Sequence, residues 1–161
     1  MQTESARVVG LPETAVYQQQ FVVRYDYPVY FTDGVFDREN PLFEQVLRRF
    51  EPAKRHRFAV FVDANVAASW PALAYDIAAY ARLRDAALEL VAEPELVPPG
   101  EQSKNDAGLV TRLQQRLADL AIDRHSYVVG IGGGAVLDLV GYVAATSHRG
   151  VRHVRVPTTV L

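Results

Sequence analysis

From residue 58 onward, the sequence alternates short apolar runs with longer segments of helical spacing. The runs have the length and the β-branched or aromatic content of strands, and they cover residues 58–62, 88–91, 127–131 and 151–156. The segments between them are long enough for the crossover helices that parallel strands of one sheet require. This order predicts an α/β fold with a doubly wound, mostly parallel sheet and right-handed crossovers.

Helices are predicted between these strands over residues 71–87, 103–120 and 134–147. In the second of them, Ser103 is the expected N-cap, with Asp106 three residues later. Its buried stripe consists of leucines at helical spacing: Leu109, Leu113, Leu117 and Leu120. Segment 94–100 is rich in proline and is therefore expected to be a loop.

The N-terminal part has a different character. We expect residues 1–15 to be a flexible N-terminus and residues 16–161 to form one α/β domain. Segments 21–25 and 28–31 are β-branched and aromatic, and they predict two short paired strands, an N-terminal β-hairpin. Asn40 is the predicted N-cap of a short helix whose first turn contains Pro41.

Composition excludes several classes of protein. The chain has 17 Lys and Arg against 19 Asp and Glu, a net charge of −2, which indicates no general attraction to nucleic acid or to an anionic membrane. It contains no Cys, so disulfide scaffolds, Cys-ligated zinc sites and thiol nucleophiles are excluded. Neither a secretory signal nor a run of about 18 apolar residues is present. We therefore expect a soluble cytoplasmic protein.

The stretch from Gly130 to Ala135, with Gly132, Gly133 and Gly134 inside it, carries the strongest chemical signal. It leaves an apolar strand and enters a helix, where glycines allow close approach of the backbone and the helix start favours an anion such as a pyrophosphate. The stretch satisfies G-x-G-x-x-A, which favours a Rossmann-like dinucleotide site. A tight turn without a ligand remains an alternative.

Two features leave this interpretation incomplete. The dinucleotide pattern needs an acidic residue about 20 positions later, and segment 150–155 contains none. No Gly-Lys-Ser or Gly-Lys-Thr follows the glycines, so a P-loop is disfavoured. Asp138, one turn into the helix, can accept a hydrogen bond from a sugar hydroxyl or an amide, although a plain carboxylate near a helix N-terminus is the commoner case.

Three stretches together resemble the sugar phosphate cyclases, whose best-known member is 3-dehydroquinate synthase. They are residues 99–104 (PGEQSK), 132–139 (GGGAVLDL) and 149–159, from Arg-Gly to Pro-Thr-Thr. Leu137 stands where the synthase usually has a Gly, and Ala135 where it has a larger aliphatic residue. These forms, and the His-Arg-Gly at residues 148–150, are more similar to the EboD-type branch.

The resemblance implies an NAD-binding domain with these cofactor-binding residues: Asp63, Glu101, Lys104, Gly133, Gly134, Ala135, Asp138, Thr158 and Thr159. It implies that Arg149 reaches the substrate phosphate of a neighbouring subunit in a homodimer. Asp63 would supply the acid that the simple pattern lacks. Taken alone, Ser103 can be a plain helix cap with Glu101 and Lys104 solvated, and Thr158-Thr159 can be a turn.

The reaction implied by the resemblance is transient oxidation of an alcohol of a small-molecule sugar phosphate, phosphate elimination, reduction and intramolecular aldol closure. Zinc or another divalent metal is implied only with a helical C-terminal domain. We expect that domain to be absent here and the chain to be truncated at its C-terminal end. We therefore expect no catalytic or metal-binding residues in this chain. In isolation it is expected to bind NAD weakly or not at all, and to be inactive.

Two other functions stay open. The chain can be a fragment of a metal-dependent glycerol or alcohol dehydrogenase, or a non-catalytic nucleotide-binding module. The basic cluster at residues 148–155 is too small for a nucleic-acid interface and is expected to be a solvated loop and strand edge. His56 and His125 stand beside arginines and are expected at the surface.

Overall fold

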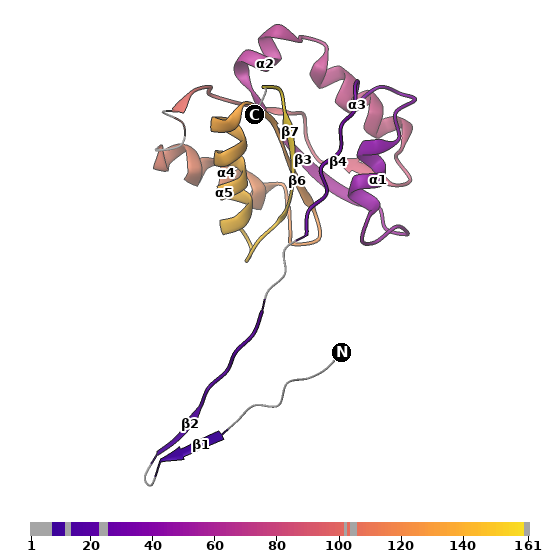
Figure 1. The fold of residues 1–161 in the computed structure, drawn as a ribbon. Coiled ribbons are helices and arrows are strands. Elements are labelled where there is room, and N and C mark those ends of the chain that lie inside the picture. The colour runs from indigo at the N-terminus through magenta and orange to yellow at the C-terminus, as the bar shows by residue number, and fades with distance from the viewer. Residues whose placement is uncertain (1–7, 12–13, 23–25, 102, 104–105, 160–161) are drawn as a thin grey trace. The chain divides into compact units, whose positions relative to one another are not determined.

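The computed structural model describes residues 8–11, 14–22, 26–101, 103 and 106–159, and it gives only the backbone for the described residues up to 17. It divides into two compact units, residues 1–32 and residues 33–161. Each unit is described by itself (Figure 1). Whether residues 1–15 are flexible, and whether 16–161 act as one domain, stay predictions.

The first unit contains a β-hairpin, but not the one predicted. Strand β1 (Val8–Leu11) pairs antiparallel with β2 (Thr14–Tyr17). The strands predicted over segments 21–25 and 28–31 do not form in residues 21–22 or 28–31, so the prediction is wrong there. Residues 23–25 lie outside the described residues. Pro28 lacks the N–H that a sheet ladder requires, and apolar residues such as Phe31 are exposed, so strand-like composition does not become a strand without a partner.

The second unit is built on a parallel sheet, as predicted. Its strands within the described residues are β3 (His56–Asp63), β4 (Leu88–Leu90), β5 (Glu95–Val97), β6 (Tyr127–Gly132) and β7 (Arg152–Pro157). The order is β4-β3-β6-β7, and β5 also pairs with β3, farther along that strand than β4. The prediction of a loop over 94–100 is therefore wrong for Glu95–Val97. A strand can form there because the prolines lie on either side of these three residues, and an edge strand tolerates prolines at its ends.

Helices cover both faces of this sheet (Figure 1). Helices α1 (Leu42–Arg48) and α3 (Leu73–Leu83) pack on one face, and α4 (Ala107–Asp119) and α5 (Gly134–Thr146) on the other. Successive residues of β3 point to opposite faces, so Phe58 and Val60 join the first core while Ala59 and Phe61 join the second. This confirms the doubly wound arrangement.

The helix boundaries differ in detail from the predictions. Helix α1 has Pro41 at its N-cap position, although Asn40 still accepts a hydrogen bond from the Leu42 N–H at 3.0 Å. A separate short helix, α2 (Ala64–Ser69), precedes α3. The predicted cap of α4 is wrong: Asp106 accepts from the Leu109 N–H at 2.9 Å, whereas the Ser103 hydroxyl donates to the Pro98 carbonyl at 2.7 Å.

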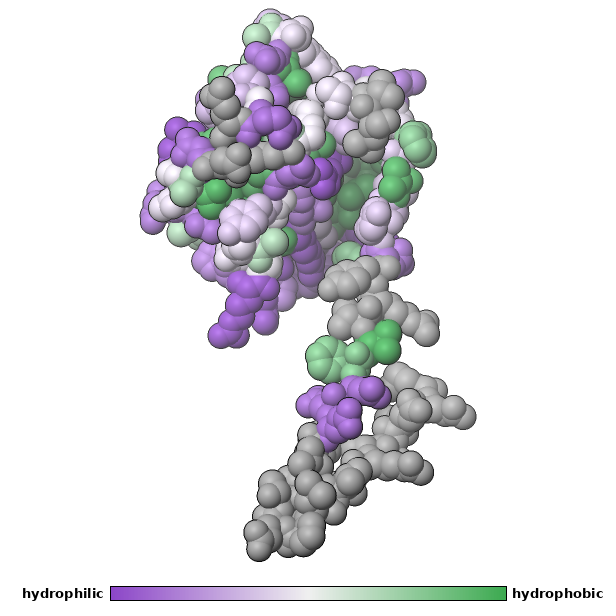
Figure 2. All heavy atoms as spheres, turned by 60° about the vertical axis from the view of Figure 1, so that its left-hand side comes forward, coloured by the Kyte–Doolittle hydropathy of each residue, from purple (hydrophilic) through white to green (hydrophobic). Residues whose placement is uncertain are grey.

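The predicted stripe of α4 is largely confirmed, because Leu109, Leu113 and Leu117 are buried and Leu120 packs at the edge of the same core. The side of residues 33–161 that carries α4 and α5 shows mainly hydrophilic residues with some apolar patches between them (Figure 2). Within the described part of the chain, no helix is long and apolar enough to cross a membrane.

Candidate cofactor site at the carboxyl edge of the sheet

The ends of three adjacent strands bring several of the predicted site residues together. Strand β3 ends at Asp63, β6 ends at Gly132, and β7 ends just before Thr158. The Thr158 N–H donates to the Gly132 carbonyl at 3.0 Å, which holds the end of β7 against the glycine turn. Ligands of open parallel sheets bind at this edge.

Asp63 and Gly132 are in direct contact at the centre of this edge. The Asp63 side chain is only 8% exposed and caps α2 by accepting from the Asn65 N–H at 2.8 Å. A Cβ on Gly132 would lie 2.7 Å from the Cβ of Asp63 and 3.3 Å from that of Val136. Glycine is therefore required here, because any side chain would collide with the buried acid.

The next residues form an open helix start. Helix α5 begins at Gly134, and its N-cap residue, Gly133, makes no side-chain capping bond. A Cβ on Gly134 would meet no atom within 4 Å, and one on Gly133 would lie 3.6 Å from Cγ2 of Thr159. The first N–H groups of the helix have no partner within the helix and carry its positive dipole end. A pyrophosphate group therefore fits this turn, with Ala135 in the first turn behind it.

Asp138 lies one turn further along α5 and has a partner that the sequence reasoning did not identify. Its Oδ1 accepts from Nη2 of Arg155 on β7 at 2.8 Å. Arg155 pairs in register with Gly130, so it lies on the α5 side of the sheet. Strand alternation from Val154 and Val156, which pack in the other core, indicates the face on which Arg155 lies but not its partner.

Three predicted site residues lie in other segments or outside the described residues. Glu101 is exposed in a short turn after β5, and Lys104 lies outside the described residues. Arg149 is exposed in the loop between the end of α5 and the start of β7, at the opposite edge of the sheet. The backbone φ of Arg149 is positive, at 66°, and that of the next residue, Gly150, is 103°.

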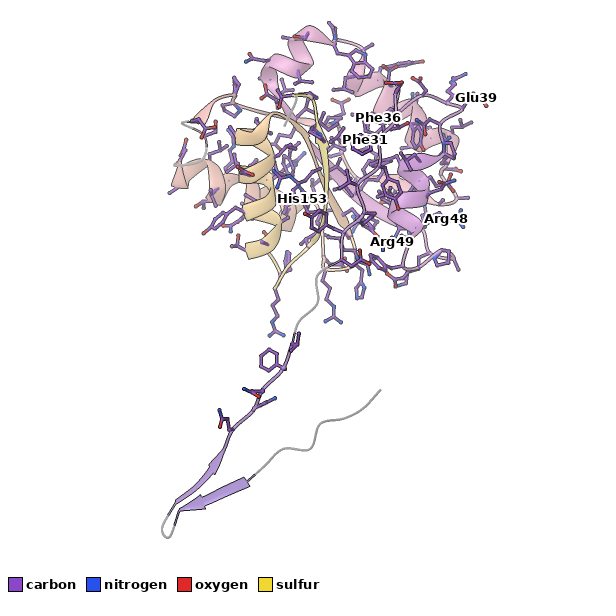
Figure 3. All side chains as sticks on the ribbon, in the orientation of Figure 1. Phe31, Phe36, Glu39, Arg48, Arg49 and His153 are labelled. Carbon is purple, nitrogen blue, oxygen red and sulfur yellow. The ribbon has the colours of Figure 1, made fainter. Side chains whose placement is uncertain are left out.

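Two histidines predicted at the surface are instead packed in the fold. His56 is 2% exposed, with its Nε2 3.0 Å from the Glu51 carbonyl oxygen. His153 lies between β7 and α5 (Figure 3), where Cβ atoms on Gly130 or Gly141 would come within 3.4 Å of its ring. Burial, and then the charge of Arg155, lower the pKa of His153 to about 4. His125 is exposed, as predicted.

A hollow of about 300 Å³ lies away from this edge, beside α1 and the turn before β4. Three of its charged residues are engaged with one another, since Glu44 accepts from Arg48 at 2.7 Å and from Arg84 at 3.2 Å. Its fourth, Lys54, pairs with Glu51. The Arg84 guanidinium also stacks on the Tyr80 ring at 3.7 Å. These groups are committed to the packing of α1 on α3, so the glycine turn is the better candidate site.

Comparison of the sequence with known proteins identifies relatives of the part of the chain that contains the glycine turn. The model of the 3-dehydroquinate synthase N-terminal family matches residues 95–161. The 3-dehydroquinate synthase of Thermobifida fusca (strain YX) is 50% identical over 68 residues, 42% of this chain and 18% of that protein. The synthase of Caulobacter vibrioides (strain NA1000 / CB15N) is 35% identical over 138 residues, 84% of this chain and 33% of that protein.

Solved structures of sugar phosphate cyclases share the fold. A 2-deoxy-scyllo-inosose synthase complexed with carbaglucose-6-phosphate, NAD⁺ and Co²⁺ is 26% identical, with a TM-score of 0.53 over 73% of this chain and 30% of that one. ValA, a 2-epi-5-epi-valiolone synthase from Streptomyces hygroscopicus subsp. jinggangensis 5008 with NAD⁺ and Zn²⁺ bound, is 23% identical, with a TM-score of 0.64 over 88% of this chain and 35% of that one. These findings confirm the resemblance to sugar phosphate cyclases, whereas the EboD-type branch stays a prediction.

This chain spans a third or less of the length of the curated relatives cited above, 18% and 33% respectively.

Proposed function

We propose that this chain forms the NAD-binding part of a 3-dehydroquinate synthase-like sugar phosphate cyclase. The observation that carries the proposal is the open start of α5, where a Cβ on Gly134 would meet nothing within 4 Å. Such a start at the carboxyl edge of a parallel sheet is suited to a pyrophosphate. Support comes from the family match over residues 95–161 and from structural relatives that contain NAD⁺.

The proposal gives each gathered residue a role in holding the cofactor. The backbone of Gly133, Gly134 and Ala135 receives the pyrophosphate, as the dipole and the small side chains allow. The hydroxyls of Thr158 and Thr159 can donate to and accept from the nucleotide. Asp63, held in place as the α2 cap, accepts from the adenosine ribose.

Asp138, Glu101 and Lys104 are proposed to contact the ribose and nicotinamide side. When bound, NAD supplies a reversible hydride acceptor, and the residues of this chain bind and orient it. The substrate of the complete enzyme is proposed to be a small sugar phosphate. Arg149 lies at the far edge of the sheet, a position that suits contact with the substrate phosphate of a second subunit, since a guanidinium fork matches phosphate oxygens. Cytoplasmic location and a homodimer belong to the same proposal.

Titration of the ¹⁵N-labelled chain with NAD tests the cofactor assignment. We expect weak binding, with chemical-shift changes concentrated at residues 132–138 and 158–159. Gly134→Val combined with Lys104→Met should abolish them, because the side chain at Gly134 would enter the ligand's path and its Cβ would meet no protein atom within 4 Å. Ala145→Val, at an exposed position near the other end of α5, is the matched control.

Unchanged NAD affinity in the Gly134→Val/Lys104→Met variant would show the assignment to be wrong. A phosphate-release assay with heptulose phosphates and Zn²⁺ separately tests activity, and we expect no turnover from this chain alone. Release of phosphate by the isolated chain would contradict the expectation that further residues are needed.

A further inference from the structure

The ion pair between Asp138 and Arg155 links the two elements that border the glycine turn. It joins α5 to β7 through a 2.8 Å contact between Oδ1 and Nη2. The two side chains are 51% and 49% exposed, so the pair faces solvent and its own contribution to stability is small. Stability alone is therefore a weak explanation for its position.

The position of Asp138 is unfavourable for an anion at the helix start. Asp138 lies four residues after Gly134, or about 6 Å along the helix axis, which is within one Debye length at physiological ionic strength. An uncompensated carboxylate there would repel a pyrophosphate at Gly133 and Gly134. The guanidinium of Arg155 places a positive charge directly on that carboxylate.

The strand also fixes where this guanidinium lies. Arg155 pairs in register with Gly130, and two residues later Pro157 pairs with Gly132 at the turn itself. The Thr158 N–H then bonds to the Gly132 carbonyl, so the end of β7 is held against the turn. Arg155 is thus anchored by the same strand that presents Thr158 and Thr159.

From this geometry we propose that Arg155 is a cofactor-positioning residue, which holds the Asp138 carboxylate in place and offsets its charge beside the pyrophosphate turn. The inference rests on the proposed NAD-binding function. Arg155 acts through Asp138 and does not itself contact the cofactor. Its loss therefore matters only while Asp138 is present.

The test is a double-mutant cycle in which the NAD affinity of each variant of the whole chain is measured by NMR titration. Arg155→Met should weaken NAD binding about two- to fivefold, the range expected for an exposed ion pair. Arg155→Lys, which keeps the charge, should restore most of it. In an Asp138→Asn background, Arg155→Met should have no further effect. Arg116→Met, which breaks a comparable exposed pair with Glu95 at 3.1 Å, is the control and should leave NAD affinity unchanged.

The possible failures can be told apart. If the unaltered chain binds NAD and Arg155→Met binds it equally well, the positioning role is wrong while the proposed function stands. If Arg155→Met weakens binding just as much in the Asp138→Asn background, Arg155 contacts the cofactor directly and the inference is overturned. The proposed function predicts weak but detectable binding, so if the unaltered chain shows no response to NAD, the proposed function fails, and this inference fails with it.

Discussion

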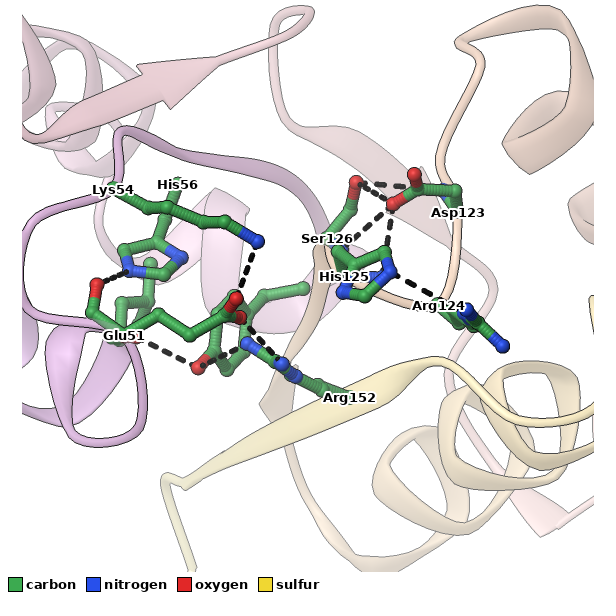
Figure 4. Close-up of polar contacts among 10 residues, drawn as sticks. Glu51, Lys54, His56, Asp123, Arg124, His125, Ser126 and Arg152 are labelled. Carbon is green, nitrogen blue, oxygen red and sulfur yellow. Dashed lines mark hydrogen bonds and ion pairs between the residues drawn. The ribbon is translucent and has the colours of Figure 1, made fainter.

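The two edges of the parallel sheet are built from different kinds of contact. At the amino edge, polar side chains bond to one another (Figure 4). Glu51 accepts from Arg152 at 2.6 Å and also pairs with Lys54, and these bonds lower the pKa of Glu51 to about 2. The Tyr127 hydroxyl donates to the Leu47 carbonyl at 2.7 Å and accepts from Arg152 at 3.3 Å.

At the carboxyl edge, glycines and backbone groups take the place of such a network. Gly132 touches Asp63 and bonds to Thr158 through its carbonyl, and Gly134 borders open space. One edge therefore satisfies its polar groups internally, while the other keeps a helix start exposed. The difference indicates that the amino edge stabilises the fold and the carboxyl edge is available to a ligand.

The largest effect is expected from a substitution at Gly132, a tightly packed position of the carboxyl edge. Gly132→Ala would place a Cβ 2.7 Å from that of Asp63, at a backbone φ of +156° that L side chains rarely adopt. Backbone or Asp63 must then move, and we expect the free energy of unfolding to fall by roughly 2–3 kcal/mol. Urea denaturation followed by circular dichroism measures this change.

Gly134→Ala is the control for this effect, because the added Cβ meets no atom within 4 Å. It should leave stability unchanged or raise it by up to about 1 kcal/mol, as alanine favours a helix over glycine. Equal destabilisation by both substitutions would contradict the distinction between a packed glycine and an open one.

Periodicity predicted much of this fold because most of its strands and helices are long enough to carry a pattern. The buried runs that became β3 and β6, and the leucine stripe of α4, could be read directly. Strand β5 could not, since it has three residues between prolines and exists only through its pairing with β3. The predicted hairpin was wrong for the related reason that segment 28–31, although strand-like in composition, pairs with no other strand among the described residues.

The geometry of the candidate site was predictable where its residues are close in sequence or follow the ends of neighbouring strands. The glycine turn and Thr158-Thr159 follow strand ends, and topology alone brings such ends together. The partner of Asp138 depends on a pairing across 17 positions, which needs the three-dimensional register of β7 against α5. His56 was misplaced because its arginine neighbours suggest a surface, although its own side chain points inward beside Tyr127.

A smaller effect is expected from breaking the amino edge. Tyr127→Phe removes the hydroxyl that joins Leu47 to Arg152 and leaves a buried carbonyl without that donor. We expect a loss of about 1–2 kcal/mol in the free energy of unfolding, measured by urea denaturation. NAD affinity should not change, because this edge lies opposite the glycine turn. A large loss of NAD affinity at unchanged stability would remove the division of roles between the edges.

The smallest effect concerns His153, which lies on β7 between the two edges. Burial lowers its pKa from 6.5 to about 4, so the unfolded chain binds more protons between these values and stability must fall as pH falls through that window. From pH 7.5 to 5.5, His153 should account for a loss of about 1 kcal/mol in the free energy of unfolding. His153→Gln should remove this part of the pH dependence, whereas His125→Gln, at an exposed position, should retain it. If both variants and the unaltered chain lose stability in parallel, the imidazole between Gly130 and Gly141 is accessible to protons in the folded state, and β7 is packed less tightly on α5 than the contacts indicate.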